Sequence, residues 1–561
     1  MPQTSFQLAH SRYLTLKDWL FHAALPLWNS IGRDDEKGGF FEKIDHSGRT
    51  IEAARRTRVV GRQIYSFAAA GKMGWPGDAQ GAVEHGWRFL RGHGINPDGT
   101  VARTVDVIEG RRDAAFDLYD HAFALFGLCA AATALEADRV AIEQDALSCL
   151  DAMMAGWKHP QAGFEEAVPP VAPLRSNPHM HLFEACLAWA ELPDTGKRAR
   201  WIALADEIGN LSLTRFICPQ TGAVREYFRD DWSVKRDEPA APVEPGHQFE
   251  WAWLLARWGR MRGRKEALVA ARRLVEIGES FGIDERTGLV RNGLDHDLKP
   301  LDNAFRLWPQ TERLKAWLLM AELTCGASDR QYALEKAAKS ADALMVFLSG
   351  VEPGLWVDRL SAAGEAIDEP APASSLYHIV CAIEEMHRVL SRPVSARPAL
   401  FLDRDGVIIE DTGYVGDFRN IRLLDGAVET IGHFRDKGFH ILVVTNQSGI
   451  GRGYYDEDDY NLVRARIGRE LGAAGLRIDD ERSAPYHEGA ADARYRRDPD
   501  WRKPEPGMIL DLVDEWNVDV ENSLMIGDKT TDMQAAAAAR LRGLLFPGGN
   551  LFDFLRESGA L

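Results

Sequence analysis

The sequence predicts two domains of different fold class, an all-α domain over residues 1–390 and an α/β domain with a parallel sheet over residues 399–561. Helical periodicity recurs through the first part with almost no strand signal. In the second part, short apolar runs alternate with helical patterns, as in βαβ units. Between them, residues 391–398 carry two prolines and no periodicity, which is typical of a linker.

Composition supports a globular chain with two unlike halves. Hydrophobic residues make up 45%, charged residues 27%, and the mean hydropathy is −0.27, which argues against a disordered or fibrous protein. Of the 16 tryptophans, 14 lie between Trp19 and Trp356, and no cysteine follows Cys381. Length alone would allow three or four domains.

The net charge, the hydropathy and the cysteines argue against several binding partners and cellular compartments. A net charge of −17 argues against binding to a nucleic-acid backbone, although a local basic pocket for a small anion stays open. No apolar stretch reaches the roughly 18 residues of a membrane span, and the first residues lack a signal-peptide pattern. The six cysteines form no CxxC pair, so we expect buried thiols in a reducing cytoplasm. We expect no membrane or nucleic-acid partner, and a homodimer is compatible with the sequence.

Twelve amphipathic or apolar segments in residues 1–390 predict twelve helices. Alternating helices of this number suggest an (α/α)6 barrel, in which six inner helices are surrounded by six outer ones. The expected helices span residues 12–30, 60–74, 78–95, 114–135, 139–157, 178–191, 197–216, 247–262, 264–281, 302–324, 330–346 and 373–390.

Unusual polar residues fall on every second predicted helix. If these helices form the inner ring, their side chains converge on one funnel. A single histidine on an apolar helix is more often a satisfied core residue, but three beside Arg and Glu favour an acid–base pocket. Trp251 and Trp308 suit packing against a sugar or plain core packing. The polar residues in question are Arg62, Asp120, His121, Asn177, His181, His247, Glu250, Arg306, Gln310 and His378.

An ordered set of short motifs over residues 10–390 resembles the N-acylglucosamine 2-epimerase family. The family implies an (α/α)6 barrel, and the Arg-Gln and Ser-Ser-Leu-Tyr-His forms are most similar to its mannose-6-phosphate isomerase-like branch. The motifs are Arg62-Gln-Ile-Tyr-Ser-Phe67, Tyr119-Asp-His-Ala-Phe123, Asn177-Pro-His-Met-His181, Gly246-His-Gln-Phe-Glu250, Trp308-Pro-Gln-Thr-Glu312 and Ser375-Leu-Tyr-His378.

This resemblance implies proton transfer beside an opened sugar carbonyl, through a cis-enediol(ate), without metal or nucleotide. His378 and His247 would act as the base and acid pair, with Glu250 orienting or polarising His247. His181 would bind hydroxyls or assist ring opening.

The resemblance also implies binding roles. Asn177 would contact sugar hydroxyls, and Arg62 would stabilise the enediolate oxygen. For a sugar phosphate, Arg58 or Arg175 is our candidate for the phosphate contact, although Arg-rich helix entrances are commonly solvated.

The C-terminal part places polar motifs directly after its predicted strands, which are 399–402, 441–444 and 523–526. Asp403 and Asp405 follow the first strand. An isolated Asp-x-Asp is usually a capping or loop feature, but three further motifs must also be explained. Together they indicate a site for Mg²⁺ and phosphate at the carboxyl ends of the strands. The three are Thr445-Asn-Gln-Ser-Gly449, Arg502-Lys503-Pro504 and Gly527-Asp-Lys-Thr-Thr-Asp532.

Over residues 399–550 these motifs resemble the haloacid dehalogenase superfamily, and more narrowly its heptose-bisphosphate and histidinol phosphatases. The resemblance implies that Asp403 is the nucleophile that becomes an aspartyl-phosphate and that Asp405 is the general acid and base. Mg²⁺ would be bound by Asp403, Asp528 and the carbonyl of Asp405.

The same resemblance implies how a phosphorylated substrate is held. Asp532 is either a supporting acid or a solvated helix residue. Thr445 and Lys503 would hold the phosphate, and Asn446 would contact the substrate. Arg452 and Arg502 are candidates for the substrate phosphate or sugar, and a surface role is an equal alternative for each.

One feature departs from the heptose-type phosphatases, which often carry a Cys/His zinc site before the Lys-Pro motif. Here the loop of residues 484–501 contains no cysteine, and His487 alone cannot hold structural zinc. We therefore expect no zinc, which leaves the leaving group open.

Our hypothesis is a bifunctional carbohydrate enzyme. The barrel would isomerise or 2-epimerise a sugar of the mannose/fructose 6-phosphate type, and the second domain would hydrolyse a sugar phosphate with Mg²⁺. One alternative is a heptose-bisphosphate-like phosphatase whose barrel only binds carbohydrate, and another is a sugar-sensing scaffold. The complete set of Asp403, Asp405, Lys503 and Asp528 argues against the scaffold.

Overall fold

The computed structural model describes residues 4–192, 196–235, 242–496 and 500–561, and the chain forms two compact units. The barrel unit comprises Met1–Trp258, Ala270–Leu319 and Glu335–Leu390. The sheet unit comprises Gly259–Val269, Met320–Leu334 and Ser391–Leu561. The segment predicted as a linker thus lies in the sheet unit, which also takes in the ends of four helices.

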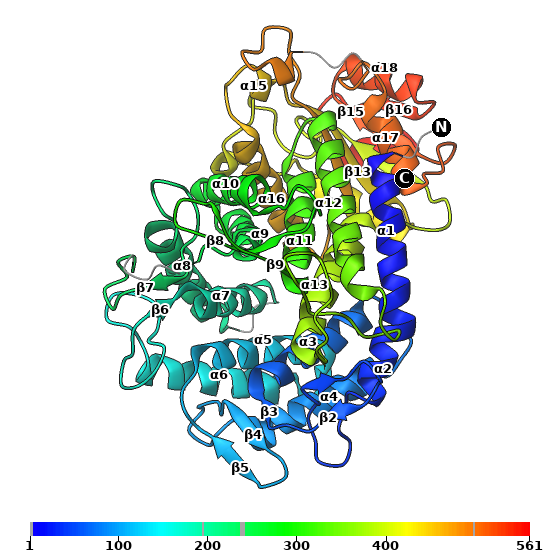
Figure 1. Ribbon diagram of the computed structural model, residues 1–561. Helices are drawn as coiled ribbons and strands as arrows, with labels where there is room; N and C mark the ends of the chain where they lie inside the picture. Colours follow the sequence, from blue (N-terminus) through cyan, green and yellow to red (C-terminus); the bar gives the residue numbers. More distant parts are fainter. Residues whose placement is uncertain (1–3, 193–195, 236–241, 497–499) are drawn as a thin grey trace. The chain divides into compact units, whose positions relative to one another are not determined.

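Twelve helical segments in the described part of residues 1–390 match the twelve predicted, and the all-α barrel prediction is confirmed (Figure 1). Three of the twelve contain a π-helical turn. In chain order they are α1 (Ser5–Trp19) with η1 (Leu20–Ala24) and α2 (Leu25–Ser30), α3 (Thr57–Lys72), α4 (Ala79–Phe89) with η2 (Leu90–Gly94), α5 (Leu118–Ala134), α6 (Arg139–Gly156) after η3 (Glu136–Asp138), α7 (Ser176–Glu191), α8 (Arg198–Leu211) with η4 (Ser212–Phe216), α9 (Pro245–Arg262), α10 (Lys265–Gly282), α11 (Leu307–Leu323), α12 (Ala327–Leu348) and α13 (Ala373–Leu390).

The inner helices are apolar on nearly every face. Helix α3 packs against α5 and α13, and α5 packs against α7, while α4, α6 and α8 cover them from outside. A helix buried on all sides is expected in the interior of a large domain. No single described helix is long and apolar enough to cross a membrane, and only the pair Leu118–Ala134 and Glu136–Gly156, bent by 116°, meets that test jointly.

Two glycines allow α3 and α5 to approach closely. A Cβ at Gly61 would lie 2.1 Å from the carbonyl oxygen of Phe123, and a Cβ at Gly127 would lie 2.7 Å from the Cα of Gly61. Any side chain at either position would force the helices apart, so both glycines fix the spacing of the inner ring.

A repeated hydrogen bond attaches the barrel's loops to its inner helices. His121 Nε2 and His179 Nε2 accept from the backbone N–H of Val101 and Phe164, both at 3.0 Å. The amide oxygens of two glutamines do the same further along the chain, Gln248 from Val224 N at 2.7 Å and Gln310 from Val290 N at 2.9 Å. Each accepted N–H belongs to a residue in an antiparallel β-bridge. Because buried backbone donors need partners, these polar side chains hold the fold together, and His121 is one of them.

Short strands at one rim of the barrel unit lead directly into inner helices. Strands β3, β6, β9 and β11 end one residue before α3, α7, α11 and α13 begin, so they place the first turns of these helices. Most are too short to produce a periodic sequence signal. The strands are β1 (Lys43–Ile44), β2 (Thr50–Ile51), β3 (Arg55–Arg56), β4 (Thr104–Asp106), β5 (Arg111–Asp113), β6 (Leu174–Arg175), β7 (Tyr227–Phe228), β8 (Arg291–Leu294), β9 (Pro300–Arg306), β10 (Arg359–Leu360) and β11 (Ala371–Pro372).

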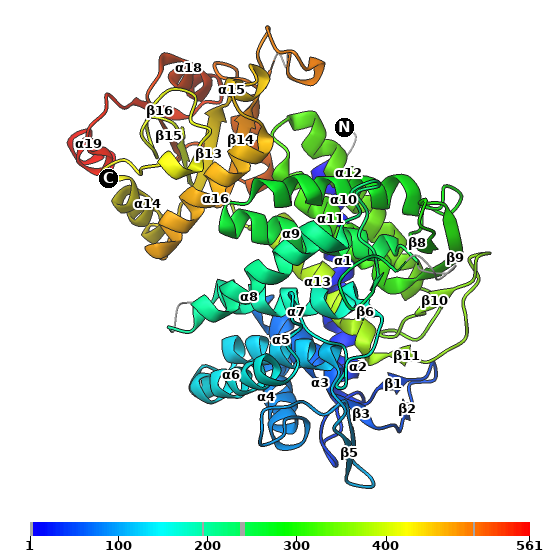
Figure 2. The same ribbon diagram turned by 90° about the vertical axis from the view of Figure 1, so that its left-hand side faces the viewer.

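The sheet unit contains the predicted parallel sheet, with strand order β14-β13-β12-β15-β16 (Figure 2). The first strand in the chain is central, so connections run outward in both directions and create a switch point beside β12. The elements are β12 (Ala399–Leu402), η5 (Phe418–Asn420), α14 (Ala427–Asp436), β13 (His440–Asn446), α15 (Ser448–Gly451), α16 (Glu457–Ala473), β14 (Asp480–Ala484), η6 (Ala493–Tyr495), α17 (Gly507–Trp516), β15 (Leu524–Gly527), α18 (Thr530–Ala538), β16 (Arg542–Leu545) and α19 (Leu551–Glu557).

Alternate residues of the central strands face two separate cores. Leu400 and Leu402 pack with apolar residues of α14, α16 and α19, whereas Ala399 and Phe401 pack with residues of α17 and α18. This period of two is expected for a strand buried on both faces. It leaves the carboxyl end of β12 as the place where polar residues can meet.

Candidate active sites

The barrel unit encloses a cavity of about 160 Å³ to which all six inner helices contribute. Seven of the polar residues that the sequence placed on one funnel line this cavity, namely Arg62, Asn177, His181, His247, Glu250, Arg306 and His378, whereas Asp120, His121 and Gln310 do not. The lining residues are Arg62, Tyr119, Asn177, His181, Glu244, His247, Glu250, Arg306, Trp308, Ser374, Ser375 and His378.

His378 is held by a buried carboxylate. Its Nδ1 lies 2.9 Å from Oε1 of Glu312, whose other oxygen lies 2.7 Å from Nζ of Lys315. Burial lowers the pKa of His378 to about 4, because it outweighs the attraction of Glu312. The neutral ring donates Nδ1–H to the carboxylate, so Nε2 carries a lone pair and is suited to act as a base.

His247 has the opposite charge state. Its Nδ1 lies 3.0 Å from Glu226 and 3.8 Å from Glu244. Burial opposes the charged ring, but these two carboxylates outweigh burial and raise the pKa of His247 to about 10. At neutral pH the ring is therefore an imidazolium that can donate a proton. The carboxylate that binds it is Glu226 rather than Glu250, which the sequence had paired with it.

Trp308 lies against both of these rings. Its ring centroid is 5.0 Å from that of His247 and 5.7 Å from that of His378. A Cβ at Gly246 would come within 2.5 Å of the Trp308 ring, so the glycine of this motif makes room for the indole. The two imidazoles of unlike charge thus share one aromatic neighbour.

His181 and Glu250 form a third acid–base group. His181 Nδ1 lies 3.3 Å from Glu184 and 3.7 Å from Glu250, and burial lowers its pKa to about 4. Tyr377 donates to the same Glu184 at 2.5 Å. Neither oxygen of Glu250 has a hydrogen-bond partner among the described residues, and burial followed by the charge of Glu312 raises its pKa well above the usual range. Burial therefore favours the protonated carboxyl of Glu250.

Two arginines supply positive charge to the cavity. Arg62 donates to Tyr119 Oη at 2.6 Å and to the Ser374 carbonyl at 3.3 Å. Among the described residues, the Nε of Arg306 has no hydrogen-bond acceptor, and Oδ1 of Asn177 has no donor. These buried polar atoms can bind a polar substrate.

The arginines proposed earlier for phosphate do not line the cavity. Arg175 forms a two-point ion pair with Glu166 at 2.6 and 3.0 Å, and Arg58 lies 3.7 Å from Asp120. Glu184 and Glu226 were missed from the sequence. Glu226 precedes the two-residue strand β7, where no helical period points to a core position.

In the sheet unit, Lys503 joins two carboxylates after the central strands. Its Nζ lies 3.0 Å from Asp403 Oδ1 and 2.6 Å from Asp532 Oδ1, and it donates to the Val444 carbonyl at 2.8 Å. Lys503 is 2% exposed, and although burial opposes its charge, these acids raise its pKa. Asn446 holds the Lys503 backbone through two hydrogen bonds of 3.0 and 3.1 Å. Asp532 therefore orients the ammonium beside Asp403.

Asp405 is positioned by its sequence neighbour and by Gln447. Arg404 donates to both Asp405 oxygens at 3.0 Å, and Gln447 Nε2 donates to Asp405 at 2.8 Å and to Thr445 Oγ1 at 2.8 Å. Burial raises the pKa of Asp405, with Arg404 opposing the shift. Sequence reasoning found Thr445 but missed Gln447, because one amide between two motif residues carries no distinct signal.

The acidic residues here fit a divalent cation. Oxygens of Asp403, Asp528 and Asp532 lie within 4.8 Å of one another, and Oδ1 of Asp528 is buried without a hydrogen-bond partner in the described chain. Hard cations prefer such carboxylate oxygens. Both oxygens of Asp532 have protein partners, Oδ1 with Lys503 and Oδ2 with the Lys529 N–H, whereas the contacts of Asp403 fall on Oδ1. This leaves Asp403 and Asp528 as the side chains best placed for a metal.

Cationic and aromatic side chains lie in the loops of this unit. Arg452 lies 5.5 Å from the ring of Tyr414, which packs edge-on against the exposed Tyr454. Burial and then the charge of Arg452 lower the pKa of Arg502, so the two guanidinium groups are neighbours. Residues 497–499 of the loop once considered for zinc lie outside the described residues.

Comparison with known proteins identifies both parts. Residues 39–382 match the family described as N-acylglucosamine 2-epimerase (GlcNAc 2-epimerase). The chain belongs to the N-acylglucosamine 2-epimerase family. Residues 380–540 match the haloacid dehalogenase-like hydrolases, so this N-acylglucosamine 2-epimerase family member carries a second enzyme domain. Both resemblances drawn from the sequence are confirmed, and both domains belong to enzyme families.

Individual relatives follow the same division. A mannose-6-phosphate isomerase of Rhizobium meliloti (strain 1021) is 46% identical over 377 residues, which are 67% of this chain and 97% of that protein. A D-glycero-beta-D-manno-heptose-1,7-bisphosphate 7-phosphatase of Rhodopseudomonas palustris (strain ATCC BAA-98 / CGA009) is 43% identical over 162 residues, 29% of this chain and 89% of that protein. The structure of cellobiose 2-epimerase from Spirochaeta thermophila DSM 6192 superposes with a TM-score of 0.60 at 22% identity, over 68% of this chain and 97% of that one, which supports the barrel fold.

The charge of His247 in the epimerase-family domain predicts a pH dependence of stability. Its pKa is about 10 in the folded chain and about 6.5 when unfolded. The folded state therefore binds more protons between these values, and the stabilisation by His247 is complete below about pH 6.5 and is lost as the pH rises toward 10. Thermal unfolding of wild type and His247→Gln from pH 6 to 10 should show a difference in Tm that shrinks as the pH rises.

His121→Gln is the control, because burial lowers the pKa of His121 to about 4 and it has no alkaline titration. A difference in Tm for His247→Gln that stays constant up to pH 10 would contradict the assignment.

Proposed function

We propose that this protein is a bifunctional carbohydrate enzyme. Its barrel interconverts an aldose and a ketose, or two 2-epimers, of the mannose/fructose 6-phosphate type through a cis-enediol(ate). Its second domain hydrolyses a sugar phosphate through an aspartyl-phosphate with the help of Mg²⁺.

One observation carries the barrel assignment: three imidazoles line one cavity, each with its own buried carboxylate on Nδ1. The pairs are His181 with Glu184, His247 with Glu226, and His378 with Glu312. Isomerisation at a carbon beside a carbonyl needs a base without a proton and an acid with one at the same pH. His378 and His247 meet that need, because their pKa values lie on opposite sides of neutrality.

Conversion of an opened aldose into the ketose takes one proton from C2 and delivers one to C1. His378 Nε2 takes the C2 proton, the C–H electron pair forms the C1=C2 bond, and the carbonyl electrons move to O1. His247 or the protonated Glu250 gives O1 a proton, and Arg62 stabilises the enediolate oxygen. The C1=C2 electron pair then takes the proton back from His378 at C1, the O2–H pair forms the C2=O bond, and the O2 proton goes to the group that protonated O1, which yields the ketose. Return of a proton to the other face of C2 would instead give the epimer.

A phosphorylated substrate is supported by the arginines of the cavity and by the name of one similar protein. We assign the phosphate contact to Arg306, because it lines the cavity with a free Nε, whereas Arg58 and Arg175 are paired elsewhere. Asn177 and His181 would contact sugar hydroxyls. The mannose-6-phosphate isomerase of Rhizobium meliloti is the relative that suggests this sugar.

The phosphatase assignment rests on Lys503 beside Asp403. An Asp403 oxygen attacks phosphorus, the bond from phosphorus to the sugar oxygen breaks, and Asp405 protonates that oxygen. Water then gives a proton to Asp405 and attacks phosphorus, the bond from phosphorus to the Asp403 oxygen breaks, and inorganic phosphate leaves. Lys503, Thr445 and Asn446 would hold the phosphate. Asp403, Asp528 and the Asp405 carbonyl would hold Mg²⁺, which supplies charge neutralisation to the phosphoryl group.

Arg452 and Arg502 are our candidates for the leaving-group side. They are neighbouring cations in the loops of the sheet unit, and Tyr414 and Tyr454 provide an aromatic surface beside them. An anionic sugar, such as one bearing a second phosphate, fits such a surface.

Reciprocal inactivation tests the two activities. In D₂O, wild type should place deuterium at C1 or C2 of mannose 6-phosphate and should release phosphate from a sugar-phosphate panel only with Mg²⁺. His378→Ala should abolish the exchange, by at least about 100-fold, and leave phosphate release intact. Asp403→Asn should do the reverse.

Two results would contradict the proposal. Absence of exchange in wild type with both free and phosphorylated hexoses would leave the barrel a carbohydrate-binding domain. Equal Mg²⁺-dependent phosphate release by wild type and Asp403→Asn would exclude the aspartyl-phosphate.

Arg306 should determine preference for the phosphorylated sugar. Arg306→Gln is expected to raise KM for mannose 6-phosphate by about 10-fold or more, because charge-assisted hydrogen bonds are the strong ones, and to leave KM for mannose nearly unchanged. Steady-state isomerisation of both sugars measures this. Arg175→Gln is the matched control, and an equal loss on both sugars would assign Arg306 a structural role.

A further inference from the structure

The turn between α11 and α12, residues 323–327, belongs to the sheet unit and is bound there through its backbone. Asn461 donates to the Leu323 carbonyl at 2.7 Å, Cys325 N donates to Glu457 at 3.2 Å, and Ala327 N donates to Tyr486 Oη at 3.1 Å. The turn is therefore fixed on α16 and on the loop after β14.

One side chain of this turn enters a compact cluster. Cys325 is 5% exposed and packs with Ile450, Tyr460 and Tyr495, with Tyr455 against the same cluster. In a close-packed interior, a change of volume at Cys325 has to displace these tyrosines.

Two of the tyrosines contact the groups that position Asp405. Tyr455 Oη donates to Gln447 Oε1 at 2.5 Å, and the same amide donates to Asp405. The guanidinium of Arg404, which holds both oxygens of Asp405, lies 5.2 Å from the ring of Tyr460. Two short paths thus run from Cys325 to the carboxyl of Asp405.

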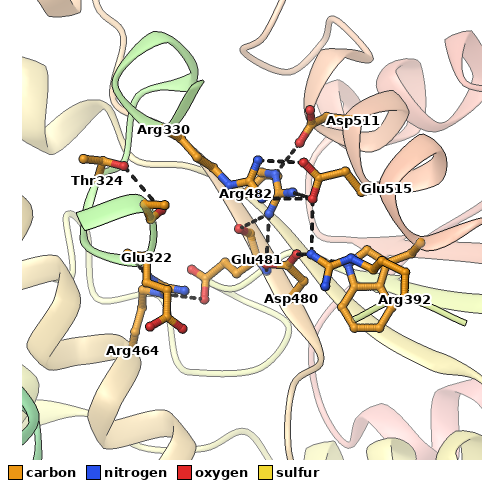
Figure 3. Close-up of polar contacts among 12 residues, drawn as sticks. Glu322, Thr324, Arg330, Arg392, Arg464, Asp480, Glu481, Arg482, Asp511 and Glu515 are labelled. Carbon is orange, nitrogen blue, oxygen red and sulfur yellow. Dashed lines mark hydrogen bonds and ion pairs between the residues drawn. The ribbon is translucent and has the colours of Figure 1, made fainter. Parts of the chain in front are cut away.

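Buried ion pairs attach the flanks of the turn as well (Figure 3). Arg330 binds Glu515 through both oxygens at 2.7 and 2.9 Å, and Arg482 binds Glu515 at 2.6 Å. On the other side, Arg464 donates to the Glu322 carbonyl at 2.8 Å and to Glu481 at 3.2 Å. Because breaking a buried pair is strongly destabilising, the flanks stay in place while the turn is altered.

We propose that the turn at 323–327 positions Asp405 through Cys325, Tyr455 and Tyr460, so that proton delivery to the leaving group depends on a segment far from the phosphatase motifs in sequence. The inference rests on the proposed role of Asp405 as general acid. Cys325, Tyr455 and Tyr460 are positioning residues and do not touch the substrate.

The leaving group separates positioning from general stability. Phenolate is a more basic leaving group than p-nitrophenolate, so phenyl phosphate depends more on the proton of Asp405 when the bond from phosphorus to oxygen breaks. Since kcat/KM reports the first phosphoryl transfer, a misplaced Asp405 should lower kcat/KM for phenyl phosphate and spare that for p-nitrophenyl phosphate.

The test uses the full chain with Mg²⁺. Cys325→Phe and Tyr455→Phe should lower the ratio of kcat/KM for phenyl phosphate over p-nitrophenyl phosphate by about 10-fold, given the size of general-acid effects. Cys325→Ala, which leaves a small void, should lower it less and carries the test together with Tyr455→Phe if Cys325→Phe does not fold.

Two controls lie in the same segment. Thr324→Ala removes a hydroxyl that bonds to the Ala321 carbonyl and should leave the ratio unchanged. Arg330→Ala should lower Tm without changing the ratio. An unchanged ratio in Cys325→Phe and Tyr455→Phe, or an equal loss on both substrates, overturns the inference while the phosphatase assignment stands. If wild type releases phosphate neither from these esters nor from the sugar-phosphate panel, the proposed phosphatase function fails, and the inference fails with it.

Discussion

The charge state of the carboxylates buried in the barrel site depends on how few positive charges lie beside them. Lys315 is fully buried, lies 2.7 Å from Glu312 and sits 4.0 Å from the ring of Trp253. Because an unpaired buried charge costs several kcal/mol, Glu312 is ionised beside this lysine, whereas burial raises the pKa of Glu250, which has no donor among the described residues. Lys315 thus keeps Glu312 ionised, whereas the proton on His247 follows from Glu226 and Glu244.

The same constraint operates at the carboxyl end of β12. Lys503 lies between Asp403 and Asp532, and Arg404 compensates the charge of Asp405. In both units, a buried cation lies beside the acids and orients them. The chemistry differs because the barrel surrounds its acids with imidazoles, whereas the sheet unit leaves Asp528 with an oxygen suited to a metal.

The architecture of both parts could be predicted from periodicity, since twelve helices and the parallel strands leave clear patterns. The polar cavity residues on the inner helices could also be predicted, because a polar residue in an apolar helix stands out from its neighbours. Glu226 and Gln447 were missed because they lie in loops, and His121 resembled a site residue although it accepts the N–H of Val101. Helical periodicity shows that a helix has a buried face but does not show which element covers that face. The inclusion of residues 320–334 in the sheet unit therefore had no sequence signal.

The mechanism proposed for the barrel requires His247 and His378 to have opposite protonation states. The ¹⁵N chemical shifts of the histidine side chains at pH 8 report the protonation state of each ring. In the substrate-free full chain, with signals assigned by His247→Gln and His378→Gln, His247 should show two protonated nitrogens. His378 should show a proton on Nδ1 and a lone pair on Nε2. The same protonation state in both rings would contradict the assignment of His247 as the acid and His378 as the base.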